Sequence, residues 1–137
     1  MAIKKVAFVV DKLPYKTETS RLALTHAISS QTVEIHLEED ENITPVLAFI
    51  GEGVLNCIKD QKAPDIYGIT SLESHIKNAL LTDIKLLICA EDVKRFGLSE
   101  DALIMDAEDL GADIVSEVVP FDDIMEEMNT SDHILFF

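Results

Sequence analysis

The chain has 137 residues, of which 47% are hydrophobic, and it carries a formal net charge of −15. This length suits one domain over residues 1–137, because domains typically span about 100–200 residues, and its core is large enough to fold without disulfides. The excess of acidic groups would repel a phosphate backbone, which argues against direct nucleic-acid binding. The apolar runs are far shorter than the roughly 20 residues that a membrane-spanning helix requires, so we expect no membrane insertion.

The cysteine and histidine content also limits the class of protein. Two cysteines, Cys57 and Cys89, are too few for the disulfide framework of a small secreted domain, and the first ten residues lack the long apolar segment of a signal peptide. We therefore expect a cytoplasmic protein. The four histidines are scattered without ligand spacing, so the sequence predicts no metal site. It has neither a Walker loop nor a complete G-x-G-x-x-G motif, and we expect no cofactor.

The charge is distributed unevenly along the chain. Arg95 is the last basic residue apart from histidine, and twelve Asp or Glu residues follow it. The simplest interpretation is a solvated acidic surface that keeps the domain soluble. The alternative is that the negative field steers a basic protein partner toward this one.

The first part of the chain predicts a strand, a loop and a helix. Residues 3–10 form a continuous apolar run rich in β-branched residues, which is typical of a strand covered on both faces. A loop over residues 11–17 follows, and Thr19 or Ser20 is suited to cap a helix. The apolar positions of this helix recur at helical spacing: Leu22, Ala23, Ala27 and Ile28. Residues 31–42 suit a short strand, an extension of the helix or a surface excursion, and these alternatives stay open.

The middle of the chain repeats this alternation. Residues 45–50 predict a second buried strand, and Gly51-Glu52-Gly53 predicts a flexible turn from which a helix over 54–59 can start close to the strand end. We expect a loop over residues 62–68. Residues 71–81 place apolar side chains on one helical stripe, and residues 84–89 predict the third strand.

The last third predicts two more strands. A short helix over 91–96 is expected to end at Gly97, and Ser99 is expected to open a further helical segment. Residues 113–119 predict a strand, Pro120 starts a helix that runs to Met128, and residues 133–137 form a terminal strand. Strands that alternate with helices indicate an α/β fold with a mainly parallel, five-stranded sheet and helices on both faces.

Three sequence features are expected at the carboxyl ends of the strands, where parallel sheets gather ligands and reactive groups. The first is the loop after the first strand, with Pro14, Tyr15 and Thr17. The second is the Gly51-Glu52-Gly53 turn, and the third is Cys89 with Ala90.

Cys89 is the one plausible nucleophile. A cysteine at the start of a helix sees unpaired backbone N–H groups and the positive end of the helix dipole, which lower the pKa of a thiol. Glu91 and Asp92 follow at once, and their charges would raise it. A buried, unreactive cysteine remains the structural alternative, since free cysteine is among the most buried residue types. Cys57 lies in an amphipathic pattern and is interpreted as a core side chain.

Several segments together resemble a known family. They are residues 4–10, Pro14-Tyr15-x-Thr17, residues 48–54 (Ala-Phe-Ile-Gly-Glu-Gly-Val), the stretch from Ile88-Cys89-Ala90 to Arg95-x-Gly97-Leu98, and residues 131–137. Spanning nearly the whole chain, these segments resemble the DsrE/DsrF sulfur-relay proteins, most closely the DsrF/TusC-type subunit. Lys16 stands where the family usually has a glycine.

The resemblance implies a fold and a function. It implies a flavodoxin-like three-layer sandwich that assembles with related subunits or with itself into trimers or hexamers. Such assemblies pass persulfide sulfur from donor to acceptor proteins, toward tRNA 2-thiouridine or in dissimilatory sulfur oxidation, and Cys89 matches the carrier cysteine of the DsrE/TusD-type subunit. In the DsrF/TusC-type branch this position is not always cysteine, so a noncatalytic scaffolding subunit is the alternative. A third hypothesis is a small-molecule binding module at Pro14, Tyr15 and Glu52.

Overall fold

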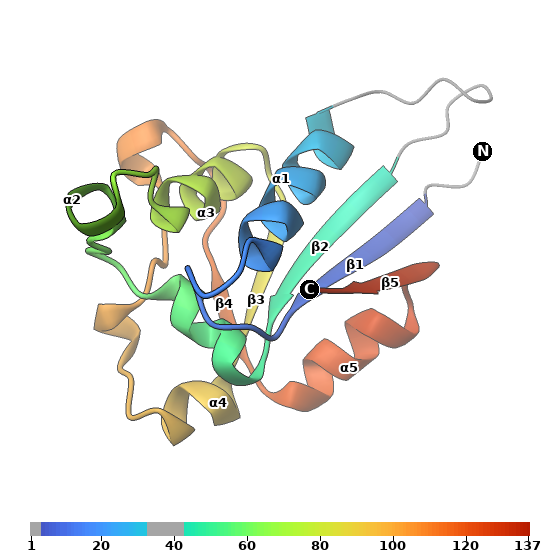
Figure 1. Ribbon diagram of the computed structural model, residues 1–137. Coiled ribbons are helices and arrows are strands. Elements are labelled where there is room, and N and C mark those ends of the chain that lie inside the picture. Colours follow the sequence, from blue (N-terminus) through green and yellow to red (C-terminus); the bar gives the residue numbers. More distant parts are fainter. Residues whose placement is uncertain (1–3, 33–42) are drawn as a thin grey trace.

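One sheet of five parallel strands organises the chain (Figure 1). The computed structural model describes residues 4–32 and 43–137. The strands are β1 Lys4–Val10, β2 Ile43–Phe49, β3 Lys85–Cys89, β4 Glu117–Val119 and β5 His133–Phe136, and they lie in the order β4-β3-β2-β1-β5. All four neighbouring pairs are parallel. The predicted five-stranded sheet is therefore confirmed, and it is parallel throughout.

Helices cover both faces of this sheet. The α-helices are α1 Thr19–Thr32, α2 Ala63–Tyr67, α3 Leu72–Leu81, α4 Ala90–Arg95 and α5 Phe121–Asn129, and the 3-10 helices are η1 Gly51–Cys57, η2 Glu100–Ala102 and η3 Glu108–Leu110. Figure 1 shows α1 and α3 on one side of the sheet and α5 on the other. The connections from β1 to β4 proceed across the sheet in one direction, and the connection from β4 to β5 returns in the opposite direction. Because this connection is also right-handed, it places α5 on the opposite face of the sheet. The result is the expected three-layer sandwich.

The core lies on the two faces of the central strands. Residues 6–10 of β1, 46–49 of β2 and 86–89 of β3 are buried almost completely, as expected of strands covered on both sides. They pack against apolar residues of the helices, among them Leu24 of α1, Ile76 and Leu80 of α3, and Ile124 of α5. No helix in the described part of the chain is long and apolar enough to cross a membrane.

Some predicted elements differ from the structure. The turn at residues 51–53 and the helix expected over 54–59 are one 3-10 helix, η1, and the expected loop over 62–68 contains the short helix α2. The helical segment expected from Ser99 is only the single turn η2, because the chain turns back at once to pair Leu103 with Ile58. Of residues 113–119, only 117–119 pair with β3. Gln31 and Thr32 extend α1, and residues 33–42 lie outside the described part.

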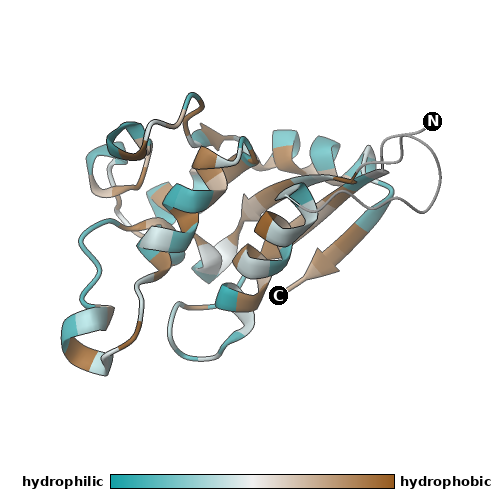
Figure 2. Cartoon of the chain, turned by 90° about the horizontal axis from the view of Figure 1, so that it is seen from above, coloured by the Kyte–Doolittle hydropathy of each residue, from teal (hydrophilic) through white to brown (hydrophobic). Residues whose placement is uncertain are grey.

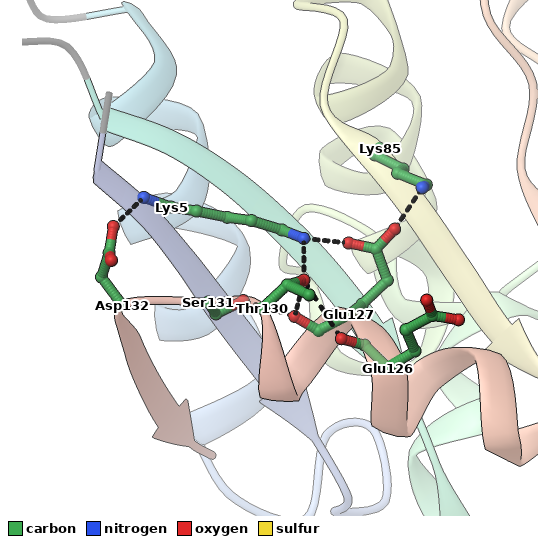
Figure 3. Close-up of polar contacts among 7 residues, drawn as sticks. All are labelled: Lys5, Lys85, Glu126, Glu127, Thr130, Ser131 and Asp132. Atoms are coloured by element: carbon green, nitrogen blue, oxygen red, sulfur yellow. Dashed lines mark hydrogen bonds and ion pairs between the residues drawn. The ribbon is translucent and has the colours of Figure 1, made fainter. Parts of the chain in front are cut away.

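A cluster of ion pairs fastens α5 to the underside of the sheet (Figure 3). The ammonium groups of Lys5 on β1 and Lys85 on β3 both pair with the Glu127 carboxylate of α5. Lys5 Nζ also donates to Thr130 Oγ1 at 2.8 Å. Burial alone would raise the pKa of Glu127, but the hydrogen bonds from Lys5 and Lys85 outweigh it and lower that pKa. The hydrogen bond to Glu127 likewise raises the pKa of Lys85.

We expect Glu127→Gln to lower the free energy of unfolding by about 1 kcal/mol at neutral pH, because the cluster is partly exposed and solvent screens it. A carboxylate whose pKa is lowered on folding stabilises the fold above its unfolded pKa of about 4.3, and this stability is lost as the pH falls through the folded pKa. The difference from wild type should therefore vanish in acid. Urea unfolding at several pH values checks this, with exposed Glu126→Gln as the matched control. A difference independent of pH would contradict it.

Candidate functional site

Cys89 lies at the carboxyl end of β3, as the sequence predicts. It is the last residue of that strand and immediately precedes α4, with its neighbours in the sheet at the ends of β2 and β4. Only 1% of Cys89 is exposed, and Ala90 beside it is half-buried. The thiol therefore sits at the edge where parallel sheets carry functional groups, but under cover in the single chain.

Two carboxylates fix the start of α4 around Cys89. Glu91 accepts hydrogen bonds from the Phe121 N–H at the start of α5, at 2.9 and 3.2 Å, and its Oε1 lies 3.9 Å from Cys89 Sγ. Asp92 Oδ2 accepts a hydrogen bond from the Gly51 N–H at 2.6 Å, and its Oδ1 lies 3.3 Å from Arg95. Cys89 is thus enclosed by segments that follow three different strands.

These surroundings keep the thiol protonated. Burial is the largest cause and, with the Glu91 and Asp92 carboxylates, it raises the pKa of Cys89 to about 11, although the backbone N–H of Asp92 acts in the opposite direction. The sequence left the direction of this shift open between the helix start and the acidic neighbours. In the structure the pKa is raised, first by burial of the thiol and then by the acidic neighbours.

The Gly51-Glu52-Gly53 segment forms the first turn of η1 and meets α4 through Gly51. Gly51 has φ 55°, a left-handed conformation that side chains disfavour. A Cβ atom on Gly53 would lie 1.9 Å from the carbonyl oxygen of Val10, at the end of β1. Glu52 is exposed between them. Gly53 therefore allows η1 to pack directly on the end of β1, and Glu52 is the one side chain of this turn that is free to meet a partner.

The loop after β1 uses its predicted site residues for internal contacts. The Tyr15 hydroxyl bonds to Gln61 and accepts a hydrogen bond from the Leu72 N–H at 2.8 Å, at the start of α3. Thr17 Oγ1 lies 2.8 Å from Thr19 Oγ1, where α1 begins, and Pro14 is half-buried. These contacts tie the loop to α3 and α1. Binding by this loop stays a prediction.

Tyr15→Phe is expected to destabilise the fold by about 1–2 kcal/mol, because the Leu72 N–H would lose its acceptor in a partly buried place. Tyr15 also has φ 65°, and the bonds of its hydroxyl help to hold that conformation. The matched control is Tyr67→Phe, since the Tyr67 ring packs 5.9 Å from Tyr15 but is 61% exposed. Thermal and urea unfolding of the two variants compares them, and equal stability would contradict the assigned role.

Two polar side chains that the sequence did not single out complete this framework. Asn56 of η1 is fully buried and donates to the carbonyl oxygens of Lys12 at 2.9 Å and Gly53 at 2.8 Å. Gln61 donates to the carbonyl oxygens of Asn56 in η1 and of Ile58 just after it, while it accepts from Tyr15. These two side chains stabilise the framework by joining segments that are distant in the sequence. The spacing of residues along the chain does not reveal such contacts. Cys57 is fully buried, and burial raises its pKa strongly, which agrees with a core role.

The predicted binding residues of the loop after β1 and of the η1 turn do not line four cavities that open on the described surface. Among the cavities on the described surface are four of about 360–380 Å³, and Pro14, Tyr15 and Glu52 line none of these four. Within residues 4–32 and 43–137, no group of three or more His, Cys, Asp or Glu side chains is placed to hold a metal ion.

Comparison with known proteins identifies relatives of this fold. The crystal structure of the ychN protein from E. coli matches with a TM-score of 0.71 and 17% identity over 98% of this chain and 99% of that chain. A protein of unknown function from Methanobacterium thermoautotrophicum, MTH1491, matches with a TM-score of 0.62 and 14% identity over 98% and 99% of the chains. BT1422 from Bacteroides thetaiotaomicron, also of unknown function, matches with a TM-score of 0.58 and 18% identity over 98% and 95%. At these identities the matches show a shared fold.

The family assignment rests on a separate comparison. No curated protein matches the sequence. The family model described as the DsrE/DsrF-like family matches residues 4–137, which covers the described part of the chain from the first residue of β1 to its end. The same stretch contains all five segments on which the sequence resemblance rests. The chain belongs to the DsrE/DsrF-like family.

Proposed function

We propose that this chain works in an intracellular sulfur-relay complex and that Cys89 is its persulfide site. The observation that carries the proposal is the position of Cys89, at the carboxyl end of β3 and beside the turn at Gly51. Membership of the DsrE/DsrF-like family supports it. The partners are a sulfur donor protein, a sulfur acceptor protein, and related subunits or further copies of the chain in a trimer or hexamer.

The reaction is a thiol exchange that needs no cofactor. The Cys89 thiolate attacks the outer sulfur of a donor persulfide, and a new S–S bond forms at Sγ while the S–S bond of the donor breaks. The donor leaves as a thiolate and takes up the proton released by Cys89, so sulfur moves without net oxidation. The thiolate of the acceptor then attacks the outer sulfur on Cys89 in the same way, which regenerates the free cysteine.

Such exchange requires that a partner uncovers Cys89 and offsets the neighbouring charge. Glu91 is exposed, Asp92 is 19% exposed at its side chain, and Glu52 is exposed in the adjacent turn. A basic surface docked there would oppose the carboxylates that raise the pKa of Cys89. Charge attraction would also speed the encounter between the two proteins. The donor and the acceptor are therefore proposed to present basic surfaces to this edge.

A noncatalytic scaffolding subunit is the second candidate, and the burial and raised pKa of Cys89 favour it. Replacement of Cys89 in the assembled pathway distinguishes the two functions. The carrier predicts that Cys89→Ser abolishes sulfur delivery while the complex still assembles. The scaffold predicts unchanged delivery. Cys57→Ala is the control, because it removes the other cysteine from a buried position.

The pathway itself is open to a direct measurement. In a strain that lacks this chain, loss of 2-thiouridine from tRNA would assign it to tRNA thiolation. Loss of sulfur oxidation with intact 2-thiouridine would assign it to dissimilatory metabolism. If both stay intact in the deletion strain, the proposed relay role is contradicted.

A further inference from the structure

Within residues 4–32 and 43–137, apolar side chains and one backbone edge of the strand β5 are left uncovered. It lies at the end of the sheet and, among the described strands, pairs with β1 alone (Figure 1). Ile134 is 38%, Leu135 45% and Phe136 61% exposed. Figure 2 shows the strand as a hydrophobic arrow at the rim of the molecule. Because side chains alternate between the faces of a strand, both faces of β5 carry exposed apolar residues.

This edge is short, but it lacks acidic, lysine, arginine and proline residues and, among the described residues, a covering element. Natural edge strands are commonly short, carry charged side chains or proline, or are covered by another element. The opposite edge of this sheet follows that rule, since β4 has three residues and begins with the exposed carboxylate of Glu117. β5 has the sequence His-Ile-Leu-Phe and no such group within it. An edge of this kind is suited to pair with another strand.

We propose that β5 pairs with β5 of a second copy of this chain, antiparallel and about a two-fold axis at Leu135. The backbone N–H of Phe137 donates to Val9, and its C=O accepts from Asp11, so both groups point toward β1. Alternate residues of a strand direct these groups to opposite sides. The N–H and C=O groups of Ile134 and Phe136 therefore point to the open edge, where Ile134 of one copy can exchange two hydrogen bonds with Phe136 of the other.

The side chains suit this register. Leu135 lies beside Phe8 in the β1–β5 ladder, on the face where Phe8 stacks with Phe137, and it would meet Leu135 of the second copy directly across the axis. On the other face, Ile134 of each copy would lie opposite Phe136 of the other copy. Pairs of aliphatic and aromatic residues across antiparallel strands are favourable, and like charges do not face each other within the four residues of the strand.

The distribution of charge favours a second copy as the occupant. Two chains with a net charge of −15 repel each other and associate most readily where charge is sparse. On the side of the sheet that α1 covers, the surface next to β5 is of that kind. The neighbouring helix α1, whose His26 ring lies 6.4 Å from the Phe137 ring, has one charged residue, Arg21, among its fourteen. A basic protein would instead be attracted to the acidic surfaces elsewhere.

Sedimentation analysis of the full chain tests the pairing, which does not depend on the chemistry of Cys89. We expect Leu135→Lys to halve the mass of the wild-type assembly, because it places two ammonium groups face to face across the axis. Leu110→Lys is the matched control at 46% exposure and should leave the mass unchanged. A wild-type chain that sediments as a monomer, or an assembly whose mass Leu135→Lys does not change, would overturn the proposal.

A cross-link keeps the test independent of any folding defect in the lysine variant. Residues that face each other across an antiparallel pair have Cβ atoms about 4.5–5.5 Å apart, which thiols can bridge with a small adjustment. Leu135→Cys should therefore form a disulfide-linked dimer under mild oxidation. Leu110→Cys, with nearly the same exposure, should remain a monomer on a non-reducing gel. Equal cross-linking of the two variants would also overturn the pairing.

Discussion

Gly53→Ala is expected to destabilise the fold by at least about 3 kcal/mol, a large share of the 5–15 kcal/mol that typically stabilises a domain. The added Cβ would lie 1.9 Å from the carbonyl oxygen and 2.6 Å from the carbonyl carbon of Val10. That carbonyl ends β1, the strand next to the centre of the sheet, and accepts a hydrogen bond from the Ile50 N–H at 3.0 Å. Neither residue 53 nor the Val10 carbonyl can move without breaking the junction of β1, β2 and η1.

Gly51→Ala is the matched control in the same turn. Gly51 has φ 55°, but a Cβ atom there would meet nothing within 4 Å, so only the left-handed conformation opposes the substitution. We expect a loss of about 1–2 kcal/mol for this variant. Urea unfolding followed by circular dichroism compares the two variants. Equal losses would contradict the steric explanation for Gly53.

Alkylation of Cys89 in the isolated chain should be slow and should increase as the pH rises toward 11. With its pKa raised to about 11, roughly one thiol in a thousand is ionised at pH 8. An ordinary cysteine with a pKa of about 8.5 is ionised to roughly one quarter at that pH, so the ionised fraction differs by roughly 200-fold. Iodoacetamide labelling of the native chain, followed by mass spectrometry of the Cys89 peptide, measures this rate.

Asp92→Asn should accelerate that labelling by up to roughly tenfold, because it removes a like charge near the thiolate. The asparagine oxygen can still accept the hydrogen bond from the Gly51 N–H, so the start of α4 should stay in place. Glu108→Gln, an acidic-to-neutral change in η3, is the control and should leave the rate unchanged. If Asp92→Asn and the control label equally, charge does not restrain Cys89.

The central strands could be predicted because each is a continuous apolar run. Residues 3–10, 45–50 and 84–89 match β1, β2 and β3 closely, since strands buried on both faces need no alternation. The expected strand over 113–119 was too long. Its β-branched apolar residues include Ile114 and Val115, but the ladder with β3 begins only at Glu117. The residue at which a strand begins to pair with its neighbour depends on the tertiary structure. The sequence of a short edge strand therefore gives little information about where pairing begins.

The position of Cys89 could be predicted, but its surroundings could not. A run that ends in cysteine before an acidic helical segment places the thiol at the edge of the sheet. Its burial depends on the segment at Gly51 and on the start of α5 at Phe121, which lie 41 and 30 residues away in sequence from their partners in α4. The Gly51-Glu52-Gly53 motif likewise predicted a close approach to a strand end, but not that the end of β1 would occupy the space beside Gly53.

The persulfide site at Cys89 is tested most directly by the mass of the peptide that contains it. The chain is incubated with a persulfide donor under conditions that load a known sulfur carrier, alone and with a basic donor protein, and is then digested without reductant. We predict an increase of about 32 Da, one sulfur atom, on the Cys89 peptide, absent from Cys89→Ser and greatest with the donor protein. An unmodified Cys89 peptide in both reactions, while the known carrier is loaded, would contradict the carrier role.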